Sequence, residues 1–103
     1  MSSARRLRTS SAAQRDLDDI FDFIAADRGV TYAVRAMERL NASFDYLMTF
    51  PRAGALRDEF AEPMRVHVVW PWLVLYDADL MSDGILIVRV IDGRRDLGTL
   101  TIN

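Results

Sequence analysis

The sequence contains no cysteine, no lysine and only one histidine, His67. Without cysteine, the chain can form neither a disulfide nor a thiolate metal site. One histidine is too few for the multi-histidine cage of a zinc enzyme, and the five glycines form no phosphate-binding loop. We therefore expect a protein that holds no metal and no cofactor.

A long hydrophobic run is also missing. The longest apolar stretch, residues 68–76, includes Pro71 and is far too short to cross a bilayer. Residues 1–10 are basic but lack the apolar segment of a signal peptide. We expect a cytoplasmic protein that does not associate with membranes.

The charged residues comprise 13 basic and 15 acidic side chains, for a net charge of −2, and every basic residue is an arginine. The guanidinium fork binds carboxylates, phosphates and backbone carbonyls, although an arginine excess can equally reflect genome composition. A protein that grips nucleic acid is usually basic. Contact with nucleic acid would therefore depend on a local patch of arginines.

Half of the 103 residues are hydrophobic, which suits one domain with a core of its own. We take residues 1–103 as this domain and expect flexible ends at residues 1–4 and 98–103. Residues 5–10 alternate weakly in hydrophobicity and predict a short first strand.

Two helices are predicted next. Ser11, with Gln14 three residues later, has the capping-box spacing of a helix start, and Gly29 is typical just past a helix end. Thr31 opens a second helix, which ends before Pro51 because the residue preceding a proline avoids the helical region. The predicted buried stripes are Leu17, Ile20, Phe21 and Ile24 in the first helix and Ala33, Met37, Leu40, Phe44 and Leu47 in the second.

Three strand segments follow, at residues 64–70, 72–78 and 85–92. Pro71 forces a turn between the first two because it cannot donate to the ladder, and residues 82–84 are a second turn signal. The short break between the helices predicts an antiparallel hairpin. The predicted fold is α+β: an N-terminal strand, an antiparallel helical hairpin and a three-stranded antiparallel meander, in the order β-α-α-β-β-β.

The search for catalytic groups favours structural roles. His67 lies in a predicted strand, and the sequence has no nucleophile elbow, so we expect a partly exposed strand histidine. Three clusters of acidic residues lack metal-ligand spacing, and we interpret them as structural. The first helix carries Asp16, Asp18, Asp19 and Asp22. A loop carries Asp58, Glu59 and Glu62, and a turn carries Asp77, Asp79 and Asp83.

The aromatic residues near the predicted turn have two interpretations. Trp70, Trp72 and Tyr76 share one strand parity, provided that Pro71 does not reset the register. Such a face suits a base-stacking platform. We favour the other interpretation, in which these rings belong to the core or to a surface that a partner covers.

The arginines near the C-terminus also leave two interpretations open. Arg89 has the parity of the isoleucines Ile85, Ile87 and Ile91, and an arginine among apolar neighbours must reach an acid or a partner. The arginines whose role is in question are Arg65, Arg89, Arg94 and Arg95. Either these four converge at one sheet edge as a working surface, or Arg89 makes an internal ion pair and the last two are solvated.

Four phrases, in the same order, resemble ParE-type toxins of the ParE/RelE superfamily. They are SSAAQRDLDDIFDFIAADRG at residues 10–29, FPRAGALRDEF at residues 50–60, WLVLYDAD at residues 72–79 and GILIVRVIDGRRDL at residues 84–97. The resemblance spans residues 6–97, nearly the whole chain.

This resemblance implies a helical hairpin against an antiparallel sheet and the toxin half of a type II toxin–antitoxin pair. ParE-type toxins are associated with inhibition of DNA gyrase and are not known for catalysis of their own. The implied partners are DNA gyrase and a ParD-like, DNA-binding antitoxin that folds on the toxin in a hetero-oligomer. We assign the target-binding surface to Arg65, Arg89, Arg94 and Arg95, and antitoxin binding to Met37, Leu40, Phe44, Trp70 and Trp72.

Two alternatives stay open beside gyrase inhibition. The RelE branch cleaves messenger RNA on the ribosome with basic residues and a C-terminal tyrosine or histidine. This sequence has no aromatic residue and no histidine after Tyr76 and is mildly acidic, which suits that chemistry poorly. The other alternative is a non-toxic relative that only binds antitoxin, because Asp77 and Asp92 stand where the family often has neutral or basic groups.

Overall fold

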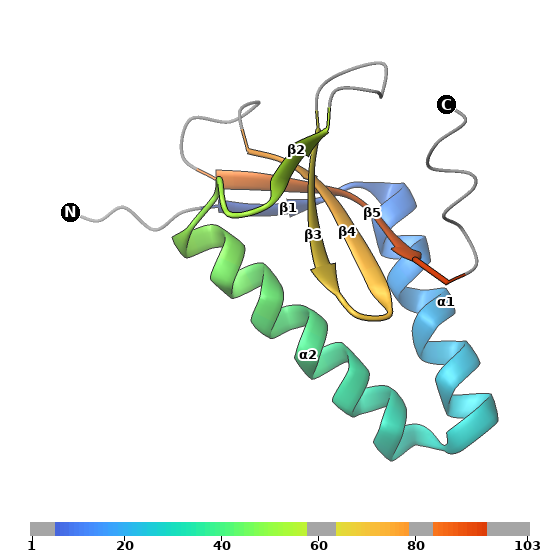
Figure 1. Ribbon diagram of the computed structural model, residues 1–103. Coiled ribbons are helices and arrows are strands. Elements are labelled where there is room, and N and C mark those ends of the chain that lie inside the picture. Colours follow the sequence, from blue (N-terminus) through green and yellow to red (C-terminus); the bar gives the residue numbers. More distant parts are fainter. Residues whose placement is uncertain (1–5, 58–63, 79–83, 95–103) are drawn as a thin grey trace.

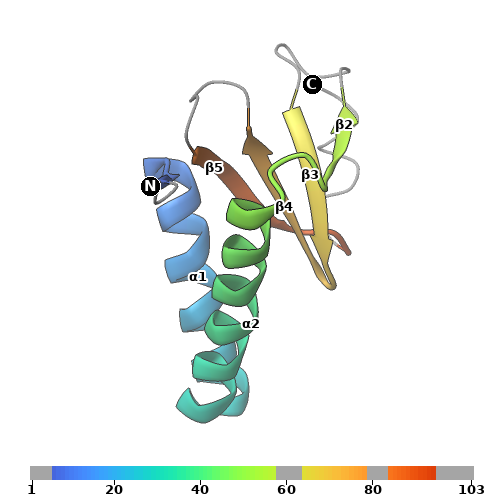
Figure 2. The same ribbon diagram turned by 90° about the vertical axis from the view of Figure 1, so that its left-hand side faces the viewer.

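The structure, a computed structural model, describes residues 6–57, 64–78 and 84–94. Its elements in chain order are β1 (Arg6–Thr9), α1 (Ser11–Arg28), α2 (Val30–Thr49), β2 (Ala55–Arg57), β3 (Met64–Val69), β4 (Trp72–Asp77) and β5 (Gly84–Asp92). The strands form one sheet in the order β1-β5-β4-β3-β2, and the helical hairpin covers one face of it (Figure 1 and Figure 2). The predicted α+β fold is confirmed.

The sheet contains the expected meander and one short strand that the sequence did not predict. β1 runs parallel to β5, and the other neighbouring strands are antiparallel. The additional strand, β2, pairs only with Met64, Arg65 and Val66 of β3. Its three residues are too few to show an alternating pattern. In the described part of the chain, the outer edge of β3 beyond Val66 therefore has no neighbouring strand.

The N-cap of α1 is Ser10, whereas the sequence pattern predicted Ser11. The Ser10 hydroxyl accepts a hydrogen bond from Ala13 N at 3.0 Å and donates one to Val88 O at 2.7 Å. The capping-box interpretation of Ser11 and Gln14 is therefore wrong. Ser10 takes the role because its backbone still bonds to β5, which holds it in the extended conformation that an N-cap requires.

Gly29 joins the two helices. Its φ of 102° lies where glycine is strongly favoured. Its N–H donates to Ala25 O at 3.0 Å, and its carbonyl accepts from Ala33 N at 3.2 Å. α2 starts at Val30, one residue before the predicted start. The tip of this tight hairpin projects past the end of the sheet in both views (Figure 1 and Figure 2).

The main core lies between the hairpin and the sheet. Its buried residues are Ala13, Ala36, Leu40, Phe44, Leu47, Trp72, Val74, Tyr76, Ile85, Ile87 and Val90. The predicted stripes are largely confirmed, because Leu17, Ile20, Ile24 and Met37 pack against this core. A smaller cluster consists of Val66, Leu73, Leu75 and Ile91. Because side chains alternate along β4, this second cluster lies on the other face of the sheet.

A register shift within the β4–β5 pair changes which side chains share a face. The shift falls in the second half of β4, and such irregularities reset the alternation of a strand. Ile85 and Ile87 belong to the main core, whereas Ile91 belongs to the opposite cluster. Arg89 lies across from Leu75 of that opposite cluster. The expected common face of Arg89 with all three isoleucines is therefore wrong.

The chain turns at Trp70 and Pro71, whose peptide bond is cis. Trp72 and Tyr76 are buried in the main core, whereas 58% of Trp70 is exposed. The turn therefore separates Trp70 from the other two rings. The core interpretation is confirmed for Trp72 and Tyr76, and the three rings form no stacking platform.

Some sequence predictions concern residues outside the described ranges: the ends at 1–4 and 98–103, the turn residues 82 and 83, the acidic residues Asp58, Glu59, Glu62, Asp79 and Asp83, and Arg95. Within the described residues, neither α1 nor α2 has the length and apolar character of a membrane-spanning helix.

Candidate functional site

The carboxylate of Asp16 ties α1 to β5. Its Oδ2 accepts hydrogen bonds from Arg89 Nε at 2.7 Å and Val90 N at 2.9 Å, and its Oδ1 accepts one from Arg89 Nη2 at 2.9 Å. Only 14% of the Asp16 side chain is exposed, against 47% for Arg89. The internal ion pair that the sequence left open is formed, with an acid on the helix and not on the sheet.

Arg94, just past β5, is held by Asp92. Asp92 Oδ1 accepts from the backbone N–H of Arg94 at 2.9 Å and from its Nε at 3.2 Å, while Oδ2 accepts from Nη2 at 2.9 Å. These bonds, together with the charge of Asp92, raise the pKa of Arg94. The Arg94 side chain is still 57% exposed. Asp92 therefore fixes the direction of an accessible guanidinium and offsets part of its charge.

Arg65 lies at the other end of the sheet from Arg94. Arg65 pairs with Tyr76 near the end of β4. Arg94 comes shortly after Asp92, which pairs with Trp72 at the start of β4. Nη1 of Arg65 donates to Gly54 O at 2.8 Å and to Arg52 O at 3.3 Å. This guanidinium therefore fastens the turn after α2 to β3.

The predicted convergence of arginines forms only in part. Arg89 and Arg94 line one small pocket of about 200 Å³ between α1 and β5. Arg65 does not line it, because most of the length of β4 separates it from Arg94. Arg95 lies outside the described residues. The target-binding role of these arginines stays a prediction.

The residues predicted for antitoxin binding are mostly inside the fold. Leu40, Phe44 and Trp72 are buried in the main core, and Met37 packs against it. Trp70 is the member of this set with a large exposed surface. The antitoxin role of the set stays a prediction, and within it Trp70 offers the most area to a partner.

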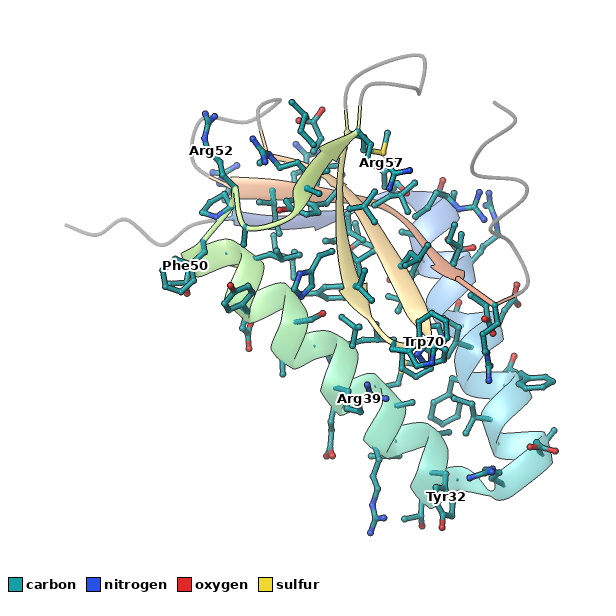
Figure 3. The ribbon with its side chains drawn as sticks, in the orientation of Figure 1. Tyr32, Arg39, Phe50, Arg52, Arg57 and Trp70 are labelled. Atoms are coloured by element: carbon teal, nitrogen blue, oxygen red, sulfur yellow. The ribbon has the colours of Figure 1, made fainter. Side chains whose placement is uncertain are left out.

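Sequence reasoning missed a group of large apolar side chains on the surface: Phe23, Val30, Tyr32, Val34, Tyr46, Phe50, Leu56 and Val68. Figure 3 shows Tyr32 and Phe50 near opposite ends of α2, with Trp70 above the helix between them. Phe23, Tyr32 and Tyr46 fall outside the predicted buried stripes. Their position off the helix stripe is the sequence signal that could have identified these three side chains as exposed.

A groove of about 590 Å³ lies between the tip of the helical hairpin and the β3–β4 turn. We call it the hairpin groove. Its charged lining residues are Arg28, Arg35, Arg39, Arg94 and Asp27, and its apolar lining includes Phe23, Ile24, Ala36 and Trp72. Arg28 and Arg35 lie over the Tyr32 ring at 5.6 and 5.9 Å, and Arg39 lies over the Trp72 ring at 5.4 Å. The groove thus combines arginines with aromatic and aliphatic surface.

His67 and Tyr76, two side chains that could act in acid–base chemistry, are both engaged in contacts within the fold. His67, half-buried in β3 as expected, stacks on Tyr46 with ring centroids 5.5 Å apart, and burial lowers the pKa of its imidazole. The Tyr76 hydroxyl accepts from Gly54 N at 2.8 Å and donates to Pro51 O at 2.7 Å. Among the described residues, no group of three histidine or acidic side chains is placed to hold a metal ion.

Comparisons with known proteins agree with this geometry. A family model described as "ParE toxin of type II toxin-antitoxin system, parDE" matches residues 7–97. Toxin ParE3 of Caulobacter vibrioides is 35% identical over 82 residues, which cover 80% of each chain. A solved structure described as a chromosomal ParDE toxin–antitoxin system from P. aeruginosa has the same fold, with a TM-score of 0.69 at 22% identity, covering 85% of this chain and 95% of that one. The chain therefore belongs to the ParE family of toxins from type II toxin–antitoxin systems.

Proposed function

We propose that this ParE-type toxin acts in the cytoplasm by inhibiting DNA gyrase, and that a ParD-like, DNA-binding antitoxin silences it by direct binding in a hetero-oligomer. Membership of the ParE family is the general support for this proposal. The exposed guanidinium of Arg94, oriented by Asp92, supplies a charged feature for contact with the target.

One observation favours an inhibitor over a ribonuclease. Cutting RNA requires groups that take a proton from the 2′-hydroxyl and return one to the leaving oxygen. The only histidine stacks on Tyr46, and the Tyr76 hydroxyl is bonded on both sides to backbone atoms. After Tyr76 the sequence has no tyrosine and no histidine. His67 and Tyr76 are therefore engaged in structural contacts and are poorly placed for acid–base catalysis, whereas inhibition by binding needs no such groups.

Induced expression in cells that lack the antitoxin tests the proposal. We expect growth arrest accompanied by a DNA-damage response while messenger RNA remains intact. Arg94→Ala combined with Arg95→Ala should relieve the arrest, whereas Arg8→Ala combined with Arg15→Ala, the matched control, should not. Cleaved messages before any DNA damage would favour the ribonuclease. Normal growth with abundant, folded protein would favour the non-toxic relative.

A further inference from the structure

The hairpin groove is much more basic than the chain that forms it. The whole chain has a net charge of −2, yet the groove is lined by four arginines and one aspartate. Two of these arginines have acidic partners: Arg28 lies 3.9 Å from Asp27, and Arg94 lies 2.9 Å from Asp92. The positive charge that remains belongs to the other two arginines of the lining.

These two arginines, Arg35 and Arg39, lie one turn apart on α2. Neither forms an ion pair with a carboxylate among the described residues. Glu38, which stands between them in sequence, is not part of the groove lining. Their guanidinium groups therefore give the groove a positive charge that a bound ligand can neutralise.

Aromatic rings hold both guanidinium groups in place. Arg39 lies over the Trp72 ring and donates from Nη2 to Trp70 O at 2.8 Å, and Figure 3 shows Arg39 on α2, below and to the left of Trp70. Arg35 lies over the ring of Tyr32. A guanidinium stacked on a ring still has N–H groups in its plane, which can bind a carboxylate through two bonds. Because the arginines are already oriented, such bonds cost little side-chain entropy.

We propose that the hairpin groove binds an acidic peptide segment, with its carboxylates on Arg35 and Arg39 and an apolar side chain on the surface formed by Phe23 and Ile24. The inference rests on the proposed function, in which this segment belongs to the antitoxin. To the proposed function it adds the composition of the antitoxin segment, in which acidic residues that bind Arg35 and Arg39 alternate with apolar residues.

The surroundings of the groove favour a peptide over DNA. The small pocket between α1 and β5 adjoins the groove through shared residues such as Trp72, and its lining includes the exposed Asp19 together with the ion pairs Asp16–Arg89 and Asp92–Arg94. A DNA duplex presents phosphates along its whole length, so beyond Arg35 and Arg39 it would meet Asp19 and arginines whose charge is already paired. A peptide places its acidic residues only where the arginines are, and the apolar lining suits its side chains.

Selection from a random peptide library tests the proposal without knowledge of the antitoxin. The library consists of peptides of about 20 residues, roughly 30 Å long as helices, and the full chain is the target. We expect enrichment of acidic peptides with aliphatic or aromatic anchors. Arg35→Glu combined with Arg39→Glu should weaken a selected peptide by about tenfold or more, since losing two charge-assisted contacts exceeds the roughly 1.4 kcal/mol of one decade.

The control makes the same change in charge elsewhere. Arg8→Glu combined with Arg15→Glu alters two exposed arginines outside the groove and should leave the affinity unchanged. Thermal unfolding followed by circular dichroism confirms that both double variants are folded. Failure to enrich acidic peptides, or equal affinity for the wild type and the groove variant, would overturn the proposal. Tight binding of a short DNA duplex that is lost in the groove variant would overturn it too and assign the groove to nucleic acid.

The same variants separate this inference from the proposed function. The groove variant should inhibit gyrase as the wild type does, because the groove is assigned to the silencing partner. If no form of the chain inhibits gyrase while acidic peptides still depend on Arg35 and Arg39, the target is wrong and the groove assignment holds. If gyrase is inhibited but peptide binding ignores these arginines, the groove assignment fails alone.

Discussion

At the scale of single residues, Asp16 continues the hydrogen bonding of β5 where its neighbouring strand ends. β1 accompanies β5 only as far as Ile87. Two residues of the next segment of chain then take over: the Ser10 hydroxyl bonds to Val88 O, and the Asp16 carboxylate bonds to Val90 N. The same carboxylate holds the Arg89 guanidinium. The start of α1 thus protects the edge of the strand that leads to Arg94.

Replacement of Asp16 should destabilise the fold. Asp16→Ala leaves the Val90 N–H and the Arg89 guanidinium without this partner, and we expect the free energy of unfolding to fall by about 1–3 kcal/mol. Asp16→Asn retains an oxygen acceptor and should lose less. Urea denaturation measures both. Asp22→Ala, an exposed position of the same helix, should have no effect, and an equal loss there would contradict the role of Asp16.

Tyr76 makes stability depend on alkaline pH. Its hydroxyl joins Gly54 N to Pro51 O, and burial raises its pKa above the ordinary value of 10.0. The unfolded chain therefore loses this proton at lower pH than the folded one. The stabilisation is complete below pH 10 and is lost as the pH rises through the folded pKa of Tyr76.

The test is the free energy of unfolding between about pH 8 and pH 11. The wild type should lose stability above pH 10. Tyr76→Phe should be less stable by about 1–3 kcal/mol at the lower pH, because the buried Gly54 N–H loses its acceptor, and should decline less steeply. Tyr32→Phe changes an exposed phenol and should keep the slope of the wild type. Identical slopes for wild type and Tyr76→Phe would refute the assignment.

At the scale of the elements, the sequence pattern and the structure name different N-cap residues for α1, and substitutions can test which is right. Ser10→Ala removes the acceptor of Ala13 N and the donor to Val88 O. We expect it to reduce the free energy of unfolding by about 1 kcal/mol or more. Ser11→Ala is the matched control, because its side chain is exposed, and should change stability little. A larger loss from Ser11→Ala would restore the capping-box interpretation. Thermal or urea unfolding gives both values.

Most of the elements could be predicted because their patterns are long. The stripe of α2 repeats from Ala33 to Leu47, and it is buried as expected. The elements that were missed depend on contacts between distant segments. β2 exists because three residues after α2 pair with β3, and the face of Ile91 depends on a register shift opposite β4. Neither the short strand β2 nor the register shift produces a periodic pattern of hydrophobic residues in the sequence.

The candidate site was less predictable than the fold for the same reason. The sequence could show that Arg89 needs an acidic partner, but Asp16 is 73 residues away in the chain. Met37, Leu40 and Phe44 follow a seam that suits either a core or a partner, and the sheet of the same chain covers that seam. The hairpin groove was missed because its arginines come from α1, α2 and the end of β5. Only the folded chain brings these residues together.

At the scale of the whole molecule, a mildly acidic chain presents one basic groove beside a pocket whose charges, except that of Asp19, form ion pairs. In the proposed binding mode, acidic side chains of the partner would be attracted by Arg35 and Arg39 and repelled near Asp19. Arg94 borders both surfaces. A partner that fills the groove would therefore also cover the guanidinium that we assign to the target. In the proposed function, the antitoxin would therefore silence the toxin by covering Arg94 directly.

In the proposed function, the chain inhibits gyrase by binding and is silenced by an antitoxin. The most direct measurement is a supercoiling and cleavage-complex assay with purified gyrase and the purified chain, with and without a candidate antitoxin. We expect the chain to block supercoiling and to trap cleaved DNA, the antitoxin to reverse both effects, and Arg94→Ala with Arg95→Ala to weaken them. Unchanged supercoiling and no trapped DNA, with a chain shown to be folded, would contradict this proposal.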